Sequence, residues 1–344
     1  MSSIKEIAKR ANVSIGTVDR VIHDRGRVSK DTKKKINQII IRLNYKPNIY
    51  ARNLSLARTF RFAVLMPKLT QDSGYWRIPA DGVDKARHDL EASKVTVQFF
   101  HYDRYSESSF RKTFQNVLKE HPDGILIAPV LTNVAHELLQ TVSRNVPYVF
   151  FDSSVPGAKC LSTIGQESYQ SGILAGKLMQ MMIKTHGTVV VIKVLPQDFH
   201  IDERIRGFEV SLKDASNIHT KICQVDSIGG ERAFDEVLKK ISTGSQDLQG
   251  IFVSNAWTHS VAKYLKSLTP ARKIFLIGYD VIARNIAYLK EGVIDFIISP
   301  RPEMQGYQGL FSLYRHVALK EKVNKKITVP LDILNKENID YYQG

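Results

Sequence analysis

The spacing of apolar residues predicts two short helices at the start of the chain. In the first helix, Ser3 and Glu6 are spaced as a capping box. Asn12 and Val13 then break the pattern, and Ser14 can cap the second helix. The positions that give each helix its apolar face are Ile4, Ile7 and Ala8, then Val18, Val21 and Ile22. The chain therefore begins with two short helices joined by a tight turn.

A third helix is predicted from Lys30 to about Leu43, with Ser29 as its cap. It ends at Asn44–Pro47, because the residue before a proline is pushed out of the α region. The segment Asn48–Ser55 that follows is too short to be a stable isolated helix and too polar to belong to a core.

From about residue 61 the pattern changes to alternating strands and helices. Apolar runs predict strands at Phe62–Met66, Val95–Phe100, Gly124–Ala128, Tyr148–Phe151, Thr188–Val194, Gly250–Val253, Lys273–Gly278 and Val293–Ile298. Helical periods fit between them at Val83–Ala92, Phe110–Lys119, Tyr169–Met182 and Phe208–Asp214. The alternation occurs twice, which is typical of two doubly wound parallel α/β lobes. A cleft between the carboxyl ends of their strands would be a natural ligand site.

Charge is concentrated at the N-terminal end of the chain. The 344 residues are 43% hydrophobic and 24% charged, enough for a sizeable core and two or three domains. Of the net charge of +15, residues 1–60 carry +10, from 14 Lys and Arg against 4 Asp and Glu. A basic end on a nearly neutral body favours binding to phosphate. A basic membrane-surface helix is disfavoured, since no broad apolar face accompanies these charges.

The positions of charged residues, apolar runs and cysteines disfavour several classes of protein. Lys5, Glu6 and Lys9 interrupt any signal peptide, and no apolar run approaches the ~20 residues of a membrane span. Cys160 and Cys223 form neither a CxxC motif nor a disulfide framework, so a cytoplasmic location is expected. The histidines lack metal-ligand spacing, and no cofactor or metal is expected.

The two short helices have the form of a helix-turn-helix, since polar residues lie at the start of the second helix. In a helix-turn-helix the second helix lies in the DNA major groove. The alternative is an ordinary pair of helices at the end of a domain. The flanking basic charge and the segment that follows favour DNA.

The N-terminal region resembles the lac-repressor (LacI/GalR-type) family. The resemblance is carried by the helix-turn-helix, then by the stretches VSKDT, LNYKPN and Ala51-Arg52-Asn53-Leu54. It implies a DNA-binding domain at residues 1–46, a hinge helix or linker at 47–59 and an effector-binding domain at 60–344. In that family the hinge helix folds only on the operator and its leucine enters the minor groove, which places Asn48, Ala51 and Leu54 at the DNA.

The resemblance also assigns residues of the second helix. Ser14 and Thr17 would face phosphates, and the residues expected to contact bases are Ile15, Gly16, Arg20 and His23. Arg20 can pair bidentately with guanine, although a solvated arginine on the helix surface is the alternative. Gly16 has no side chain with which to read a base, Asp19 replaces the usual serine, and His23 stands where asparagine is common. The operator sequence therefore cannot be transferred from a relative.

The rest of the chain resembles the type-I periplasmic sugar-binding fold that this family carries. Crossovers are expected near residues 163, 300 and 325. Lobe 1 would then hold about 60–163 and 301–325, and lobe 2 about 164–300 and 326–344.

Polar and aromatic residues follow the predicted strands at the positions that hold sugars in such relatives. These residues are Tyr75, Trp76, Asp152, Arg204, Asn255 and Asp280. Sugar hydroxyls need both donors and acceptors, and the C–H face of a sugar ring packs on an aromatic plane. Three of them have a structural alternative: Trp76 could be plain core, Arg204 could pair with Glu203 or Asp202, and Asp280 could cap the next helix.

At the second crossover between the lobes, this sequence differs from the pattern of the relatives. Relatives commonly have a glutamine ligand where Pro300 stands. Either Arg301 replaces it, which would favour an acidic sugar, or that contact is absent.

The leading hypothesis is a transcriptional regulator, most simply a repressor of carbohydrate genes. It would bind a palindromic operator in double-stranded DNA as a homodimer and respond to a sugar or sugar acid. A purine-like corepressor and a sugar-binding protein without regulatory role are the alternatives. A glycosidase using Asp152 and Asp280 is disfavoured, because no other catalytic motif accompanies them. Effector, operator and the sign of the response are left open by the sequence.

Overall fold

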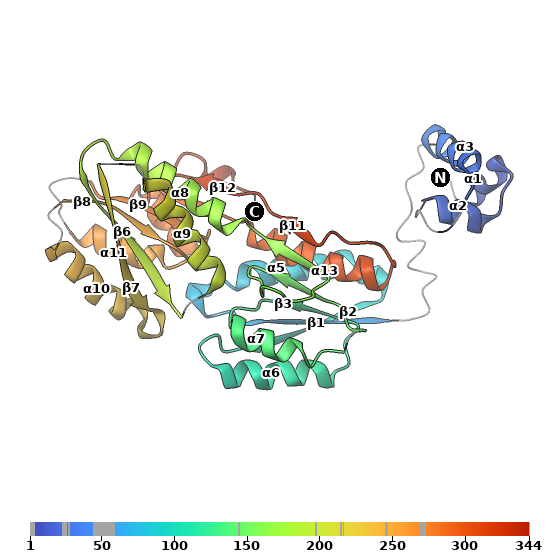
Figure 1. Cartoon of the computed structure of the whole chain (residues 1–344), viewed down its shortest axis with the longest axis horizontal. Coiled ribbons are helices and arrows are strands. Elements are labelled where there is room, and N and C mark those ends of the chain that lie inside the picture. The colour runs from blue at the N-terminus through green and yellow to red at the C-terminus, as the bar shows by residue number, and fades with distance from the viewer. Residues whose placement is uncertain are drawn as a thin grey trace. The chain divides into compact units, whose positions relative to one another are not determined.

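The protein is described from a computed structural model, which covers residues 4–22, 26, 28–43, 59–143, 145–196, 198–213, 215, 217–244, 247–268 and 273–343. It divides into two compact units (Figure 1). One holds the helices α1 to α3, and the other holds all the strands of the described residues.

The N-terminal unit is a bundle of three helices around a small apolar core. The helices are α1 (Ile4–Ala11), α2 (Ile15–Ile22) and α3 (Lys30–Arg42). Ile7, Val18 and Ile36, one from each helix, are fully buried together. Two of the predicted caps are confirmed: Ser14 Oγ accepts from Thr17 N at 3.1 Å, and Ser29 Oγ accepts from Thr32 N at 3.2 Å, while the predicted cap Ser3 lies outside the described residues. The three helices predicted from apolar spacing and capping residues are therefore present.

The first lobe of the body is a six-stranded parallel sheet with the order β11-β5-β4-β3-β1-β2. Its strands are β1 (Phe60–Pro67), β2 (Val95–Tyr102), β3 (Gly124–Ile127), β4 (Tyr148–Phe151), β5 (Ser162–Gly165) and β11 (Lys326–Thr328). Its helices are α5 (Arg77–Asp89), α6 (Glu107–Lys119), α7 (Thr132–Leu139) and α13 (Pro302–Val317), with 3-10 turns η1 (Asp72–Gly74) and η2 (Glu91–Ser93). Helices α6 and α7 cover one face of the sheet, and α5 and α13 cover the other.

The second lobe has the sheet order β12-β10-β9-β8-β6-β7, parallel except for β12, which pairs antiparallel with β10. Its strands are β6 (Gly187–Leu195), β7 (Ile218–Asp226), β8 (Leu248–Val253), β9 (Phe275–Tyr279), β10 (Phe296–Ser299) and β12 (Asp332–Leu334). Its helices are α8 (Ser168–Met182), α9 (Phe199–Leu212), α10 (Gly230–Gly244), α11 (Thr258–Ser267) and α12 (Ala283–Lys290), with 3-10 turns η3 (Ser227–Gly229) and η4 (Ile339–Tyr341).

Alternation along the strands of the second lobe gives it two cores. Val190 and Ile192 face α10, α11 and α12, whereas Val189 and Val191 face α8 and α9. Both sheet faces are thus buried, as expected for parallel strands with near-continuous apolar runs.

The chain passes between the lobes three times, from β5 to α8, from β10 to α13 and from β11 to β12. The first and third passages lie a few residues later than predicted. Strand β5 extends lobe 1 to Gly165, and β11 places Lys326–Thr328 in lobe 1 rather than lobe 2. Strand β11 has only three residues and alternates exposed and half-buried positions, so it carried no apolar run that could reveal it.

Each lobe contains one pair of helices in unusually close contact. A Cβ placed on Gly306 of α13 would lie 2.0 Å from the carbonyl oxygen of Pro79 in α5. A Cβ placed on Gly172 of α8 would lie 1.9 Å from the carbonyl oxygen of Arg204 in α9. Only glycine fits at these two positions, and each fixes one helix of its pair against the other.

Candidate functional site

The residues predicted to meet DNA lie at the start of α2. Ser14, Ile15, Gly16 and Arg20 are exposed, and Thr17 is half-buried. The Ile15 side chain is 49% exposed and therefore accessible. The Ser14 and Thr17 hydroxyls are 2.9 Å apart and take part in the cap. The predicted DNA contacts His23, Asn48, Ala51 and Leu54 lie outside the described residues.

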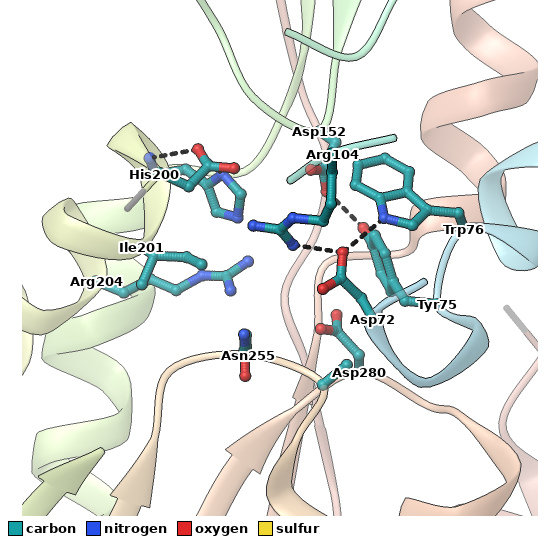
Figure 2. Close-up of a pocket in the computed structure, with 12 residues that line it drawn as sticks. Asp72, Tyr75, Trp76, Arg104, Asp152, His200, Ile201, Arg204, Asn255 and Asp280 are labelled. Atoms are coloured by element: carbon teal, nitrogen blue, oxygen red, sulfur yellow. Dashed lines mark hydrogen bonds and ion pairs between the residues drawn. The ribbon is translucent and has the colours of Figure 1, made fainter. Parts of the chain in front are cut away.

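A second candidate site is a cavity between the two lobes of the body (Figure 2). Its volume is about 350 Å³, counting the space open to solvent. The lining residues are Asp72, Tyr75, Trp76, Arg104, Asp152, Asp198, His200, Ile201, Arg204, Asn255, Ala256 and Asp280. They come from loops and a helix start that follow the carboxyl ends of β1, β2, β4, β6, β8 and β9. The structure therefore brings six of the seven predicted effector residues together.

On the lobe 1 side, the polar groups of the wall bond mainly to one another. Trp76 Nε1 donates to Asp72 Oδ2 at 2.7 Å, and the Arg104 guanidinium forms a buried ion pair with the same carboxylate. The rings of Tyr75 and Trp76 meet edge to face, 5.1 Å apart. Both rings are almost fully buried, but they line the cavity rather than a closed core.

Asp152 is held from both sides. Tyr75 donates its hydroxyl proton to Asp152 Oδ1 at 2.5 Å, and burial, with the nearby carboxylates of Asp152 and Asp280, raises the pKa of Tyr75 well above its usual value. Asp152 N donates to Gln305 Oε1 at 2.9 Å, and Gln305 Nε2 donates to Pro300 O at 2.8 Å. Gln305 is fully buried, so this amide connects the ligand wall to the second passage between the lobes.

Arg204 enters the cavity from α9. It is 2% exposed, its Nη1 donates to Ser254 O at 2.8 Å, and its guanidinium lies 4.0 Å from the centre of the Tyr279 ring. The carboxylates with which it could have paired are held elsewhere: Asp202 pairs with Lys193 and Glu203 with Arg206, each at 2.6 Å. The guanidinium therefore remains directed at the cavity, as Figure 2 shows.

Asp280 has the most unusual environment of the lining carboxylates. It is 4% exposed, its backbone is left-handed with φ of 71°, and its Oδ1 has no hydrogen-bond partner in the described part of the chain. Burial raises the pKa of Asp280 to about 7, against the attraction of Arg204. It does not cap α12, which begins at Ala283 with Ile282 in the cap position. A buried acceptor without a partner is a group that a ligand hydroxyl can satisfy.

Three further hydrogen bonds join the lobes around the cavity. Ser153 Oγ donates to Asp198 Oδ1 at 2.9 Å, Ser73 Oγ lies 2.8 Å from His259 Nε2, and Ser227 Oγ donates to the Tyr105 hydroxyl at 3.1 Å. Asp198 also pairs with His200 Nδ1 at 2.8 Å. Although burial opposes it, this histidine lowers the pKa of Asp198.

Four charged lining residues were missed by the sequence argument: Asp72, Arg104, Asp198 and His200. Their place in the sequence could have revealed three of them. Arg104 follows β2, and both Asp198 and His200 follow β6, so they lie at the same sheet edges as the predicted residues. Asn255 was predicted and lines the cavity, with its Oδ1 accepting from Trp257 N at 3.2 Å.

The expectation for Arg301 is not met by the structure. Arg301 is absent from the cavity lining; it sits at the N-cap of α13 with φ of 47°, and its Nε and Nη2 donate to Asp332 at 2.7 and 2.9 Å. The argument for an acidic sugar depended on this residue and loses its support.

The described residues contain neither a metal-binding cluster nor a membrane-spanning helix. No group of three His, Cys, Asp or Glu side chains there is placed to hold a metal ion. None of the described helices has the length and apolar character needed to cross a membrane.

Two family models match the chain. One, described as bacterial regulatory proteins of the lacI family, matches residues 3–48, and the other, described as a periplasmic binding protein domain, matches residues 62–322. The chain belongs to this periplasmic binding protein domain family and carries a lacI-family DNA-binding domain in front of it. The resemblance and the fold class inferred from the sequence are thereby confirmed.

Individual relatives agree with this assignment. The ribose operon repressor of Bacillus subtilis (strain 168) is 26% identical over 302 residues, which cover 83% of this chain and 83% of that protein. Catabolite control protein A of Staphylococcus aureus (strain MRSA252) is 27% identical over 193 residues, 54% of this chain and 55% of that protein. This match spans about half the length of that relative.

A solved structure from Bacteroides fragilis, described provisionally as a LacI transcriptional regulator, has a TM-score of 0.75 and 26% identity. The match covers 83% of this chain and 100% of that one. The body thus has the same two-lobed architecture as this structure.

Proposed function

We propose that this protein is a homodimeric, cytoplasmic repressor of carbohydrate genes, whose affinity for a palindromic operator changes when a small neutral sugar binds between the lobes. The observation that carries the proposal is the composition of the cavity. Two aromatic rings and an acceptor-rich set of polar groups line it, behind a lacI-family DNA-binding domain.

The charges of the lining favour a neutral ligand. Asp72 is paired with Arg104, and Asp198 with His200, which leaves Asp152 and Asp280 opposite the single guanidinium of Arg204. An anionic ligand would meet more acceptors than donors. A sugar can instead donate hydroxyl protons to the carboxylates and accept from Arg204, while its C–H face packs on Trp76. The ribose operon repressor, a relative over most of the chain, supports this ligand class.

Because the sugar would contact both lobes, it should bind one lobe arrangement better than others and shift their populations. The resulting coupling between the two sites is typically ~1–3 kcal/mol, a change of about 5- to 150-fold in operator affinity.

The test uses the full chain and a palindromic DNA selected from a random pool. We expect binding that weakens steeply with salt, and a loss of about tenfold or more in Arg20→Ala, since a bidentate contact to guanine contributes about 1–3 kcal/mol. Lys119→Ala, which removes an equal charge from the body, is the control. A panel of neutral aldopentoses and aldohexoses should contain one that changes this affinity. DNA binding unaffected by Arg20→Ala would remove Arg20 from the interface, and the absence of any sugar effect would remove the proposed effector class.

A further inference from the structure

Next to the first cavity lies a second and larger one, with a volume of about 620 Å³ counting the space open to solvent. It is formed by the loop after β4, the passage from β5 to α8 and the start of α9. Asp152 and His200 line both cavities, so the two are neighbours that share part of a wall.

A third residue connects the two cavities. With the Gln166 amide turned so that its nitrogen donates to Ser171 Oγ, its oxygen accepts from the Arg204 guanidinium. Gln166 lines the second cavity and Arg204 lines the first. Gln166, a residue of the second cavity, therefore holds in place the Arg204 guanidinium, which we expect to contact the ligand in the first cavity.

Two ion pairs lie at the second cavity, which the Asp152 carboxylate and His200 also line. Lys326 forms an ion pair with Glu167, and Glu203 forms one with Arg206. The remaining polar lining includes the hydroxyls of Ser154 and Ser168. The lining holds more carboxylates than cations, and such an acceptor-rich wall suits the hydroxyl protons of a neutral polyhydroxylated group.

Aromatic rings complete the lining. Phe199, at the first position of α9, is 43% exposed although its ring is large and apolar. Tyr169 is half-buried, with the guanidinium of Arg206 4.8 Å from the centre of its ring. An exposed phenyl ring beside hydroxyl and amide groups has the composition of a surface on which a sugar ring can pack.

We propose that the effector is a neutral disaccharide, with one ring in the first cavity and the second ring in this larger one. The inference rests on the proposed function, since it extends the same ligand site. A glycosidic linkage passing Asp152 and His200 would join the two rings. Joining them means that the second ring binds without a second loss of translational and rotational freedom, so the linked ligand binds more tightly than either part.

The test is calorimetric titration of the full chain with neutral monosaccharides and with disaccharides built from them, such as glucose and galactose against maltose, cellobiose, lactose and melibiose. We expect the best disaccharide to bind at least tenfold more tightly than its constituent monosaccharides. In Phe199→Ala that advantage should fall to less than threefold, while monosaccharide binding changes by less than twofold. Val210→Ala, on the same helix and 47% exposed but outside the lining, is the matched control.

A second variant fills the cavity rather than opening it. Ser154→Trp should remove the disaccharide advantage in the same way, and thermal melting of all variants verifies that they are folded. The inference is overturned if no disaccharide binds more tightly than its parts, or if Phe199→Ala weakens both classes equally. Monosaccharide binding without a disaccharide advantage overturns this inference alone, whereas binding of no sugar removes the proposed function as well.

Discussion

The two walls of the interlobe cavity differ in how their polar groups are satisfied. In lobe 1, Trp76 and Arg104 both bond to Asp72, and Tyr75 bonds to Asp152. In lobe 2, Arg204 reaches a backbone carbonyl and an aromatic face, and Asp280 Oδ1 has no partner among the described residues. In lobe 1 the unsatisfied atom, Arg104 Nε, belongs to a guanidinium that is already ion-paired with Asp72, whereas in lobe 2 the unsatisfied atom belongs to a carboxylate.

This difference assigns different roles to the lobes. Groups that already hold one another in place present a fixed surface and lose little freedom when a ligand arrives. A buried carboxylate without a partner carries an unfavourable free energy that a ligand hydroxyl can relieve. We therefore expect lobe 1 to set the shape of the site and lobe 2 to supply most of the free energy of binding.

The largest effect should follow from removing the cation of lobe 2. Arg204→Ala deletes a charge-assisted hydrogen bond to the ligand, of about 1.5–3 kcal/mol, and removes the larger of the two cationic influences on Asp280, leaving His200. We expect effector affinity to fall by about 10- to 150-fold, with operator binding in the absence of effector close to normal. Titration of both ligands measures this. Lys213→Ala, at the end of the same helix and exposed, is the control. A variant that responds to effector as the parent does would remove Arg204 from the site.

A second effect should come from breaking the support of lobe 1. In Gln305→Leu, Pro300 O loses its buried hydrogen-bond donor, at a cost of about 1–3 kcal/mol, and Asp152 N keeps only its hydrogen bond to Ile164 O at 3.2 Å. We expect a lower melting temperature together with weaker effector binding, because Asp152 is no longer fixed.

Gln305→Glu separates these two contacts, since a carboxylate still accepts from Asp152 N but cannot donate to Pro300 O. We expect its effector affinity to lie nearer that of the parent. Gln308→Leu, a half-buried position on the same helix, is the control. If Gln305→Glu and Gln305→Leu lose effector affinity equally, the contact to Asp152 is not what holds the wall.

The smallest effect concerns pH. The pKa of Asp280 in the folded protein is raised to about 7, chiefly by burial, above its ordinary value near 4. The associated stabilisation is fully present below about pH 4 and is lost as the pH rises through 7, on the order of a few kcal/mol. Asp280→Asn should remove this dependence from melting temperatures measured between pH 4 and 8.

His200 has to be separated from this effect. Its pKa is also raised, against the effect of burial, by the carboxylates of Asp198 and Asp152, so it changes stability in the same direction as pH rises. Because His200 and Asp280 interact, the difference between the parent and Asp280→Asn reports Asp280 together with its coupling to His200. Effector binding near pH 7 should also release protons in the parent and not in the variant, as measured by calorimetry in buffers of different ionisation enthalpy. Equal pH profiles for the two proteins would contradict the raised pKa.

The architecture could be predicted from the sequence where apolar spacing was strong. The helices α1 to α3 and the buried strands β1, β3, β4 and β8 were found at or within a few residues of their predicted positions. Strand β7 was missed because seven of its nine positions are exposed or half-buried, so its sequence has no apolar run. Helix α5 begins at Arg77, six residues before the predicted start, because Pro79 is tolerated in the first turn of a helix.

The candidate site was predictable only in part. Residues that directly follow apolar strands, such as Asp152 and Asp280, could be placed at the sheet edge from the sequence. The ion pair of Asp72 with Arg104 could not, because it joins two loops 32 residues apart whose meeting depends on the pairing of β1 with β2. Arg301 was misplaced for a similar reason, since its partner Asp332 lies 31 residues further along the chain.

The bidentate contact of Arg301 with Asp332 has a mechanical consequence. Arg301 lies on the second of the three passages between the lobes, and Asp332 begins the strand that follows the third. Sliding one lobe past the other would stretch at least one passage, whereas rotation about a line through all three requires only small changes in a few backbone dihedral angles. The guanidinium joins two of these passages, and we expect this contact to resist twisting between them. We therefore expect the lobes to move mainly by one rotation, and a ligand that spans the cavity to act on the rest of the protein by setting that angle.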